Sequence, residues 1–379
     1  MNSIIRSRVS NLGRLRALIG LTLLSLSPAV KAQSPGPYTL GDLKALERSF
    51  VDLAEKARPT VVAVRAYQVR TLGEDESKVK VPISQGSGFI IDPNGFIATN
   101  GHVVENADRV TVVLSDGSQF DAVVRQRDDR SDLAVLKIEA DNLPVVHWGD
   151  ASALRANQWV FACGNPFGMA NRDGQASITY GVVSAIGRDM TDRITENPQL
   201  HYYGNLIETS ATINPGSSGG PLFNVDGQIV GIVTAIETSS GVNEGLGFAI
   251  PVDANTRRIL DTLKGGQAVR YGFLGVSVDD VEPPPSRRVA ETRRNRGARI
   301  TSVSPPDGPA GSAGLRPDDV VVEFNGVPID GKDQLVRVVG FTPVGTEAVV
   351  KYLRRQVERR TTVKVGDRFE LLTGNDRPR

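Results

Sequence analysis

Between Val61 and Ile250 the chain consists mostly of short apolar runs rich in β-branched residues, separated by turn signals such as Asp92-Pro93-Asn94-Gly95. This pattern predicts many short strands without regular helices between them. Such strands are typical of antiparallel barrels or a sandwich. Because single cores rarely grow beyond about 250–300 residues, a chain of 379 residues is also long enough for two or three domains. The sequence therefore predicts a mainly β fold with more than one domain.

Two helices are expected at the borders of this β region. Apolar residues recur at spacings of three and four from Leu40 to Leu53, ahead of Pro59, and predict one amphipathic helix. Its apolar face either packs on the domain behind it or contacts another subunit. A second helix, over Pro251 to Leu263, closes the β region.

The N-terminus has the composition of a targeting segment. Arginines precede an apolar run from Ala17 to Val30, and Ala32 follows as a small residue suited to cleavage. The run has about 14 residues, fewer than the ~20 that a membrane-spanning helix needs. A cleaved signal peptide over residues 1–32 is the main interpretation, and an uncleaved membrane anchor is the alternative.

Composition excludes several classes of function. Cys163 is the only cysteine, so an intrachain disulfide cannot form, and its apolar surroundings predict a buried, unreactive thiol. A net charge of +1 gives no overall attraction to nucleic acid. Three scattered histidines and the lack of a phosphate-binding loop predict no metal and no other cofactor.

Two residues are candidates for a base and its orienting partner. His102 follows the β-type run that ends at Thr99, so its ring can project from a strand end. Asp132 comes directly before the apolar run Leu133-Ala134-Val135-Leu136, where a carboxylate is shielded from water. An imidazole held by such a carboxylate in one tautomer can take a proton from a hydroxyl.

The hydroxyl is expected in the turn Gly216-Ser217-Ser218-Gly219-Gly220. Glycines tolerate positive φ, so this turn can direct backbone amides toward a developing oxyanion. Ser218 is then the candidate nucleophile. The three residues together predict a serine hydrolase whose site forms where distant segments meet.

At this level of detail the chain resembles the HtrA (high-temperature-requirement) serine proteases of the trypsin-like clan, over about residues 40–365. The resemblance rests on several motifs in register, which include Gly86-Ser87-Gly88-Phe89, Thr99-Asn100-Gly101-His102-Val103-Val104, Ser131-Asp132-Leu133-Ala134, Gly164-Asn165-Pro166-Phe167-Gly168 and Asn214-Pro215-Gly216-Ser217-Ser218-Gly219-Gly220. It implies a trypsin-like double six-stranded β-barrel followed by a smaller PDZ domain.

The same resemblance implies roles for individual residues. It makes Ser218 the nucleophile, His102 the general base and then acid, and Asp132 the orienting carboxylate. The oxyanion hole would be lined by Gly216, Ser217 and Ser218. The substrate would be bound by Thr212, Ile213, Val233, Thr234 and Ala235, with Thr212 and Ile213 favouring short aliphatic side chains and residues 233–235 pairing with substrate backbone. One departure is the charged stretch from 189 to 205, which is longer than expected.

Residues 271–365 resemble a PDZ domain of the HtrA type. Its peptide-binding loop would consist of Gly272, Phe273, Leu274, Gly275 and Val276, whose amides would receive the C-terminal carboxylate of a peptide. The alternative is that Phe273 and Leu274 are core residues at the start of a strand.

The expected domain order follows from these assignments: 1–32 signal peptide, 33–58 helical segment, 59–264 protease domain, 265–270 linker, 271–366 PDZ domain and 367–379 flexible tail. The expected function is that of a periplasmic serine endopeptidase that degrades unfolded envelope proteins, binds C-terminal peptides and forms a homotrimer. A peptide-binding chaperone with little proteolysis, and a membrane-tethered protease with one dedicated substrate, are the alternatives.

Overall fold

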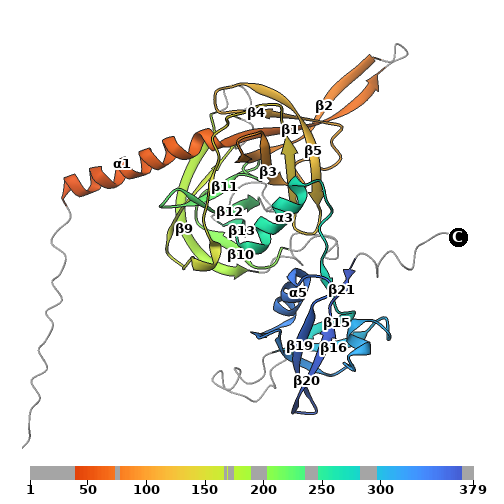
Figure 1. Ribbon diagram of the computed structural model, residues 1–379. Helices are drawn as coiled ribbons and strands as arrows, with labels where there is room; N and C mark the ends of the chain where they lie inside the picture. Colours follow the sequence, from red (N-terminus) through yellow and green to blue (C-terminus); the bar gives the residue numbers. More distant parts are fainter. Residues whose placement is uncertain are drawn as a thin grey trace, which may run out of the picture. The chain divides into compact units, whose positions relative to one another are not determined.

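The computed structural model of the chain describes residues 39–72, 77–165, 169, 175–188, 203–234, 246–281 and 297–368 (Figure 1). The expected signal segment, Ala235 and the end of the tail lie outside these ranges. Internal contacts divide the chain into two units, residues 1–48 and 49–379. No helix within the described ranges is long and apolar enough to cross a lipid bilayer.

The first half of the β region forms a closed barrel with the strand order β1-β2-β3-β6-β5-β4. Its strands are all antiparallel to their neighbours. They are β1 (Val61–Leu72), β2 (Ser77–Asp92), β3 (Phe96–Asn100), β4 (Arg109–Val113), β5 (Gln119–Asp128) and β6 (Leu133–Lys137).

The second half closes another barrel, because β11 and β12, at opposite ends of the path β11-β8-β9-β10-β13-β12, also pair with each other. The short strand β7 (His147–Trp148) adds to β12 in parallel. The barrel strands are β8 (Trp159–Gly164), β9 (Ser177–Arg188), β10 (Leu206–Thr209), β11 (Pro221–Asn224), β12 (Gln228–Thr234) and β13 (Gly247–Pro251). The prediction of two six-stranded barrels is confirmed.

Two helices flank the barrels, as expected. Helix α1 (Leu40–Ala57) ends in a short 3-10 turn at Pro59, and its last turns pack Leu53 and Ala57 into the core. Helix α3 (Ala254–Lys264) begins with Asp253 as its N-cap, whose carboxylate accepts hydrogen bonds from two backbone amides.

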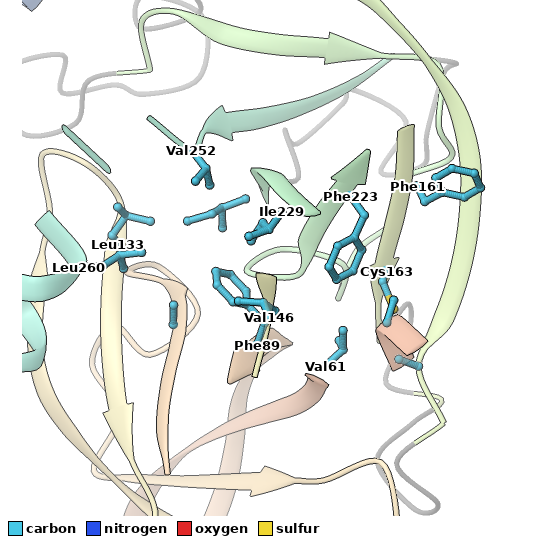
Figure 2. Packing of buried hydrophobic residues seen from close by; sticks show 14 of the residues in the cluster. Val61, Phe89, Leu133, Val146, Phe161, Cys163, Phe223, Ile229, Val252 and Leu260 are labelled. Carbon is cyan, nitrogen blue, oxygen red and sulfur yellow. The ribbon is translucent and has the colours of Figure 1, made fainter. Parts of the chain in front are cut away.

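One hydrophobic core joins the two barrels. Figure 2 shows Phe89 of β2 and Leu133 of β6 in the same cluster as Phe223 of β11 and Ile229 of β12. Cys163 lies in this cluster, and burial raises the pKa of its thiol to about 12. The prediction of a buried cysteine is confirmed, and the raised pKa leaves little thiolate near neutral pH, in line with an unreactive thiol.

The C-terminal part forms a separate sheet with the order β15-β16-β17-β19-β20, and β18 pairs with β17. Two helices and a two-stranded ribbon, β14 with β21, complete it. The elements are β14 (Gly272–Phe273), β15 (Val276–Asp280), β16 (Ala298–Val303), α4 (Pro309–Ser312), β17 (Val320–Phe324), β18 (Val327–Pro328), α5 (Lys332–Phe341), β19 (Glu347–Arg354), β20 (Val357–Lys364) and β21 (Gly366–Asp367).

The ribbon corrects the expected start of the tail. Asp367 is buried, pairs with Gly272 and accepts a hydrogen bond from Nε of Arg270 at 2.6 Å. Because this carboxylate closes the ribbon, Asp367 belongs to the folded domain rather than to a loose tail.

Candidate active site

His102 and Asp132 form a close pair at the rim of the first barrel. Nδ1 of His102 lies 2.8 Å from Oδ2 and 3.0 Å from Oδ1 of Asp132. The backbone amide of His102 donates to Oδ1 of the same carboxylate at 2.9 Å. The imidazole is partly exposed, whereas the Asp132 side chain is only 1% exposed. This is the arrangement that orients an imidazole as a base.

The backbone holds Asp132 in an uncommon conformation. Its φ is +53°, in the left-handed region. Its carbonyl oxygen accepts two hydrogen bonds of 2.9 Å, from the amide of Gly101 and from Nδ2 of Asn100. Because Asn100 and Gly101 directly precede His102, the same short segment places both members of the pair.

The pair sets the protonation of the imidazole. Burial disfavours the charged ring and acts to lower its pKa, but the negative charge of Asp132 and its hydrogen bond outweigh burial. The pKa of His102 therefore lies above its usual 6.5, with a smaller contribution from Glu105.

The turn that carries Ser218 packs against the segment around His102 on two sides. A Cβ on Gly219 would lie 2.4 Å from Oγ1 of Thr99 and 3.0 Å from the amide nitrogen of Asn100. A Cβ on Gly86 would lie 2.7 Å from the Val103 side chain and 3.0 Å from the carbonyl oxygen of Ser218. Glycines are required at both positions for this close approach. The structure thus brings together the segments that carry His102, Asp132 and Ser218.

Ser87 is a structural residue of this site that sequence reasoning did not assign. Its backbone amide donates to the carbonyl oxygen of Ser218 at 2.8 Å, and its Oγ donates to that of Gly216 at 2.7 Å. The same Oγ accepts from the amide of Asn165, and the Ser87 carbonyl accepts from Oγ1 of Thr99, both at 2.7 Å. A serine between two glycines in the motif Gly86-Ser87-Gly88 was the available signal.

The expected oxyanion hole needs one correction. The amide of Ser217 donates to the carbonyl oxygen of Asn214 at 2.9 Å, within the turn. It therefore cannot also donate to a substrate oxyanion. Gly216, with φ +95°, and Ser218 keep this assignment as a proposal.

The expected substrate strand also needs a correction. Val233 donates its amide hydrogen to the carbonyl of Gly220 and accepts from the amide of Gly219, both at 2.8 Å. Both of its backbone groups are used within the fold, so Val233 cannot pair with a substrate. Thr234, at the end of β12, remains a candidate, and Ala235 lies outside the described residues.

The two expected pocket residues have different environments. Thr212 is exposed, and its carbonyl oxygen accepts from Oγ1 of Thr179 at 2.8 Å. Ile213 is 6% exposed and lies so close to Gly247 that a Cβ there would be 2.5 Å from its Cδ1. The wall formed by Ile213 is apolar.

A second candidate site is a groove in the C-terminal domain. It is lined by the loop from Gly272 to Val276 and, on α5, by Leu335, Val336 and Val339. Leu274 is also part of the domain core, as the alternative interpretation expected. The carbonyls of Leu274 and Gly275 accept from the amides of Ala310 and Ser304, which fixes the orientation of the loop.

Comparisons with known proteins identify the two domains that carry these candidate sites. Residues 86–232 match the trypsin-like peptidase domain family, and residues 272–365 match the PDZ domain family. The chain is 42% identical over 347 residues to the probable periplasmic serine endoprotease DegP-like of Hahella chejuensis, covering 84% of this chain and 70% of that relative. The relative of the same name from Halomonas elongata is 42% identical over 287 residues, covering 75% of this chain and 56% of the relative.

Solved structures give the same result. The HtrA-type protease AlgW with a decapeptide aligns with a TM-score of 0.67 at 30% identity, covering 84% of this chain and 98% of that one. The serine endoprotease from Yersinia pestis aligns with a TM-score of 0.59 at 29% identity, covering 84% and 97%.

The raised pKa of His102 is measurable by NMR. The imidazole Cε1–H signal, assigned by its absence from His102→Gln, should titrate with a midpoint above 6.5. In Asp132→Asn the charge is gone and burial remains, so the midpoint should fall below 6.5. Asp116→Asn, in an exposed turn, serves as control and should leave the midpoint unchanged. An Asp132→Asn midpoint equal to that of the wild type would contradict the pairing.

Ser87→Ala should destabilise the fold and the site together. The variant removes a buried donor to Gly216 and a buried acceptor for Asn165, which should lower the free energy of unfolding by about 2–4 kcal/mol. Urea unfolding measures this change. Ser84→Ala, on the same strand but only half-buried, is the control and should stay within about 0.5 kcal/mol of wild type. Equal stability of the two variants would refute the assigned role.

Proposed function

The chain belongs to the family of HtrA-type, DegP-like serine endoproteases, and on this premise we propose that it hydrolyses peptide bonds with His102, Asp132 and Ser218 as its triad. The observation that carries the proposal is the paired and shielded imidazole of His102 next to the turn of Ser218. The chain spans 56% of the Halomonas elongata relative, so activity, substrates and partners of the whole protein are part of the proposal.

In the first step, Oγ of Ser218 attacks the scissile carbonyl carbon while Nε2 of His102 takes its proton. Asp132 holds Nδ1 and stabilises the imidazolium that forms. The amides of Gly216 and Ser218 would stabilise the oxyanion, and one such donor is worth about 10²–10³ in rate. The C–N bond then breaks as His102 protonates the leaving amine. Water repeats the sequence on the acyl-enzyme and releases the carboxylate product.

The substrate side chain before the scissile bond would lie near Ile213 and Thr212. The apolar wall of Ile213 and the lack of a carboxylate at position 212 favour a short aliphatic residue there. Thr234 would begin the strand that pairs with the substrate backbone, because β12 ends there. An extended substrate is required for such pairing, which favours unfolded proteins over folded ones.

The location and the assembly are inferred from sequence features and from the relatives. A signal peptide over residues 1–32 and the periplasmic relatives support an enzyme of the periplasm. A homotrimer is supported by the apolar face of α1, where Leu40, Leu43 and Leu46 are 69%, 59% and 42% exposed. Such a face is suited to contact with another subunit.

The groove of the C-terminal domain is proposed to bind peptide C-termini. Strand β15 is at the edge of its described sheet and borders α5, so a peptide can add beside it as a further strand. The left-handed Gly275, with φ +78°, shapes the loop that would receive the carboxylate. Apolar side chains of Leu335, Val336 and Val339 would contact the last side chain of the peptide.

Ser218→Ala should abolish cleavage of unfolded casein. Without the hydroxyl no acyl-enzyme forms, so the rate should fall by at least about 10⁴-fold. Thermal unfolding should be unchanged, because the substitution removes one oxygen atom. Ser118→Ala, in the exposed turn between β4 and β5, is the matched control and should cleave at the wild-type rate. Cleavage by Ser218→Ala at a rate near that of the control would reject this nucleophile.

Peptide binding should depend on a free C-terminal carboxylate. A fluorescent peptide that ends in an aliphatic residue should bind at least about tenfold more tightly than its amidated form, as measured by anisotropy. Val336→Glu should weaken binding by placing a charge in the groove, whereas Val349→Glu, at an exposed position of β19, should not. Equal affinity for both peptide forms would remove the carboxylate from the recognition.

A further inference from the structure

His102 is not the only neighbour of the Asp132 carboxylate that bears on the function of the triad. This carboxylate is 1% exposed, and His102 contacts its two oxygens through the backbone amide and Nδ1. A buried carboxylate needs hydrogen bonds on its remaining lone pairs, because each unsatisfied one costs stability and lets the group rotate. The question is which group supplies them.

Tyr203 is placed to do so. It lies three residues before β10, is 7% exposed, and its ring packs with Leu206 and Phe248. Its phenol hydroxyl forms a hydrogen bond with the Asp132 carboxylate. In the sequence, Tyr203 belongs to the charged stretch from 189 to 205 that departs from the expected length.

A separate observation places the two chain segments side by side. One cavity is lined both by Ser131 and Leu133, which flank Asp132, and by the residues that follow Tyr203, namely Gly204, Asn205 and Leu206. A segment of the second barrel thus lies close to the residues on either side of Asp132. Tyr203 approaches Asp132 from this second barrel.

The phenol can act only as the donor in this bond. Burial, and then the negative charge of Asp132, raise the pKa of Tyr203 far above its usual value, with a smaller effect of Glu105. Glu105 is itself paired with Arg127 at 3.5 Å. Tyr203 therefore keeps its proton, and an oxygen of the Asp132 carboxylate is the acceptor.

We propose that Tyr203 is a positioning residue of the triad, which holds the Asp132 carboxylate in line with Nδ1 of His102 by a hydrogen bond from the second barrel. The proposal rests on the proposed function, because it acts through the triad. In this proposal Tyr203 acts through Asp132 and has no direct role toward the substrate or the nucleophile. Its hydroxyl also takes up part of the negative charge that stabilises the imidazolium form of His102.

The test is the reaction of Ser218 with diisopropyl fluorophosphate, which needs the triad but no knowledge of the natural substrate. In Tyr203→Phe the ring packing remains and only the hydroxyl is lost. The second-order rate at the pH plateau should fall about tenfold, as expected for a lost hydrogen bond to a charged group. The acid limb should move to higher pH, since Asp132 then stabilises the imidazolium more strongly.

A double variant separates positioning from general stability. If Tyr203 acts through Asp132, then Tyr203→Phe/Asp132→Asn should react no more slowly than Asp132→Asn alone. Tyr67→Phe, a similarly buried ring on β1 of the first barrel, is the matched control and should react as the wild type.

The outcomes are distinguishable from those of the proposed function. Wild-type protein that does not react, or Ser218→Ala that does, defeats the triad itself. With the triad intact, an unchanged Tyr203→Phe rate and pH profile overturns the role of Tyr203. The role of Tyr203 is also overturned if the rate losses of the two single variants add up in the double variant and the melting temperature falls as well. A purely structural tyrosine behaves in that way.

Discussion

The geometry of the site depends on the hydrogen bonds of Ser87. Four bonds of 2.7–2.8 Å radiate from this one buried residue of the first barrel, and three of them reach the second barrel, at Asn165, Gly216 and Ser218. The fourth holds Thr99, at the strand end that leads to His102. A residue that fixes the nucleophile turn and the base segment at once transmits any displacement of one to the other. The distance between base and nucleophile is therefore set by one backbone bond and by bonds of two short, buried hydroxyl side chains, rather than by long, flexible side chains.

The second constraint is the close packing of the backbone around the pair of His102 and Asp132. Gly219 has φ +83°, and a Cβ there would lie 2.2 Å from the Ser87 carbonyl oxygen. Asp132 adopts φ +53° although it has a side chain, at a cost of order 1–3 kcal/mol that its carbonyl bonds to Asn100 and Gly101 offset. Strain of this kind persists only where the surroundings determine the conformation completely. Here they do, because the same segment bonds to Asp132 and carries His102.

The parts of this site that sequence could predict are those governed by local chemistry. His102 follows a strand, Asp132 precedes one, and Ser218 lies in a glycine turn, so the neighbouring residues in the sequence predict the place of each. Ser217 and Val233 were assigned wrongly because their amides are used by Asn214 and Gly220, and such pairing is decided by the register of the turn and of β12. Ser87 and Tyr203 were missed for a related reason. Their partners lie 129 and 71 positions away along the chain, at distances over which a sequence pattern carries no contact information.

No disulfide joins the two barrels, because Cys163 is the only cysteine of the chain. Phe89 and Leu133 from one barrel and Phe223 and Ile229 from the other share one core, so separating the barrels would expose all of these side chains to water. Cys163 lies within that core as a buried thiol, and burial raises its pKa, so little reactive thiolate forms there. The core and the Ser87 bonds act on the same interface in different ways. Apolar burial holds the barrels together but tolerates small shifts, whereas the directional bonds of Ser87 fix the register of the two barrels closely enough for proton transfer.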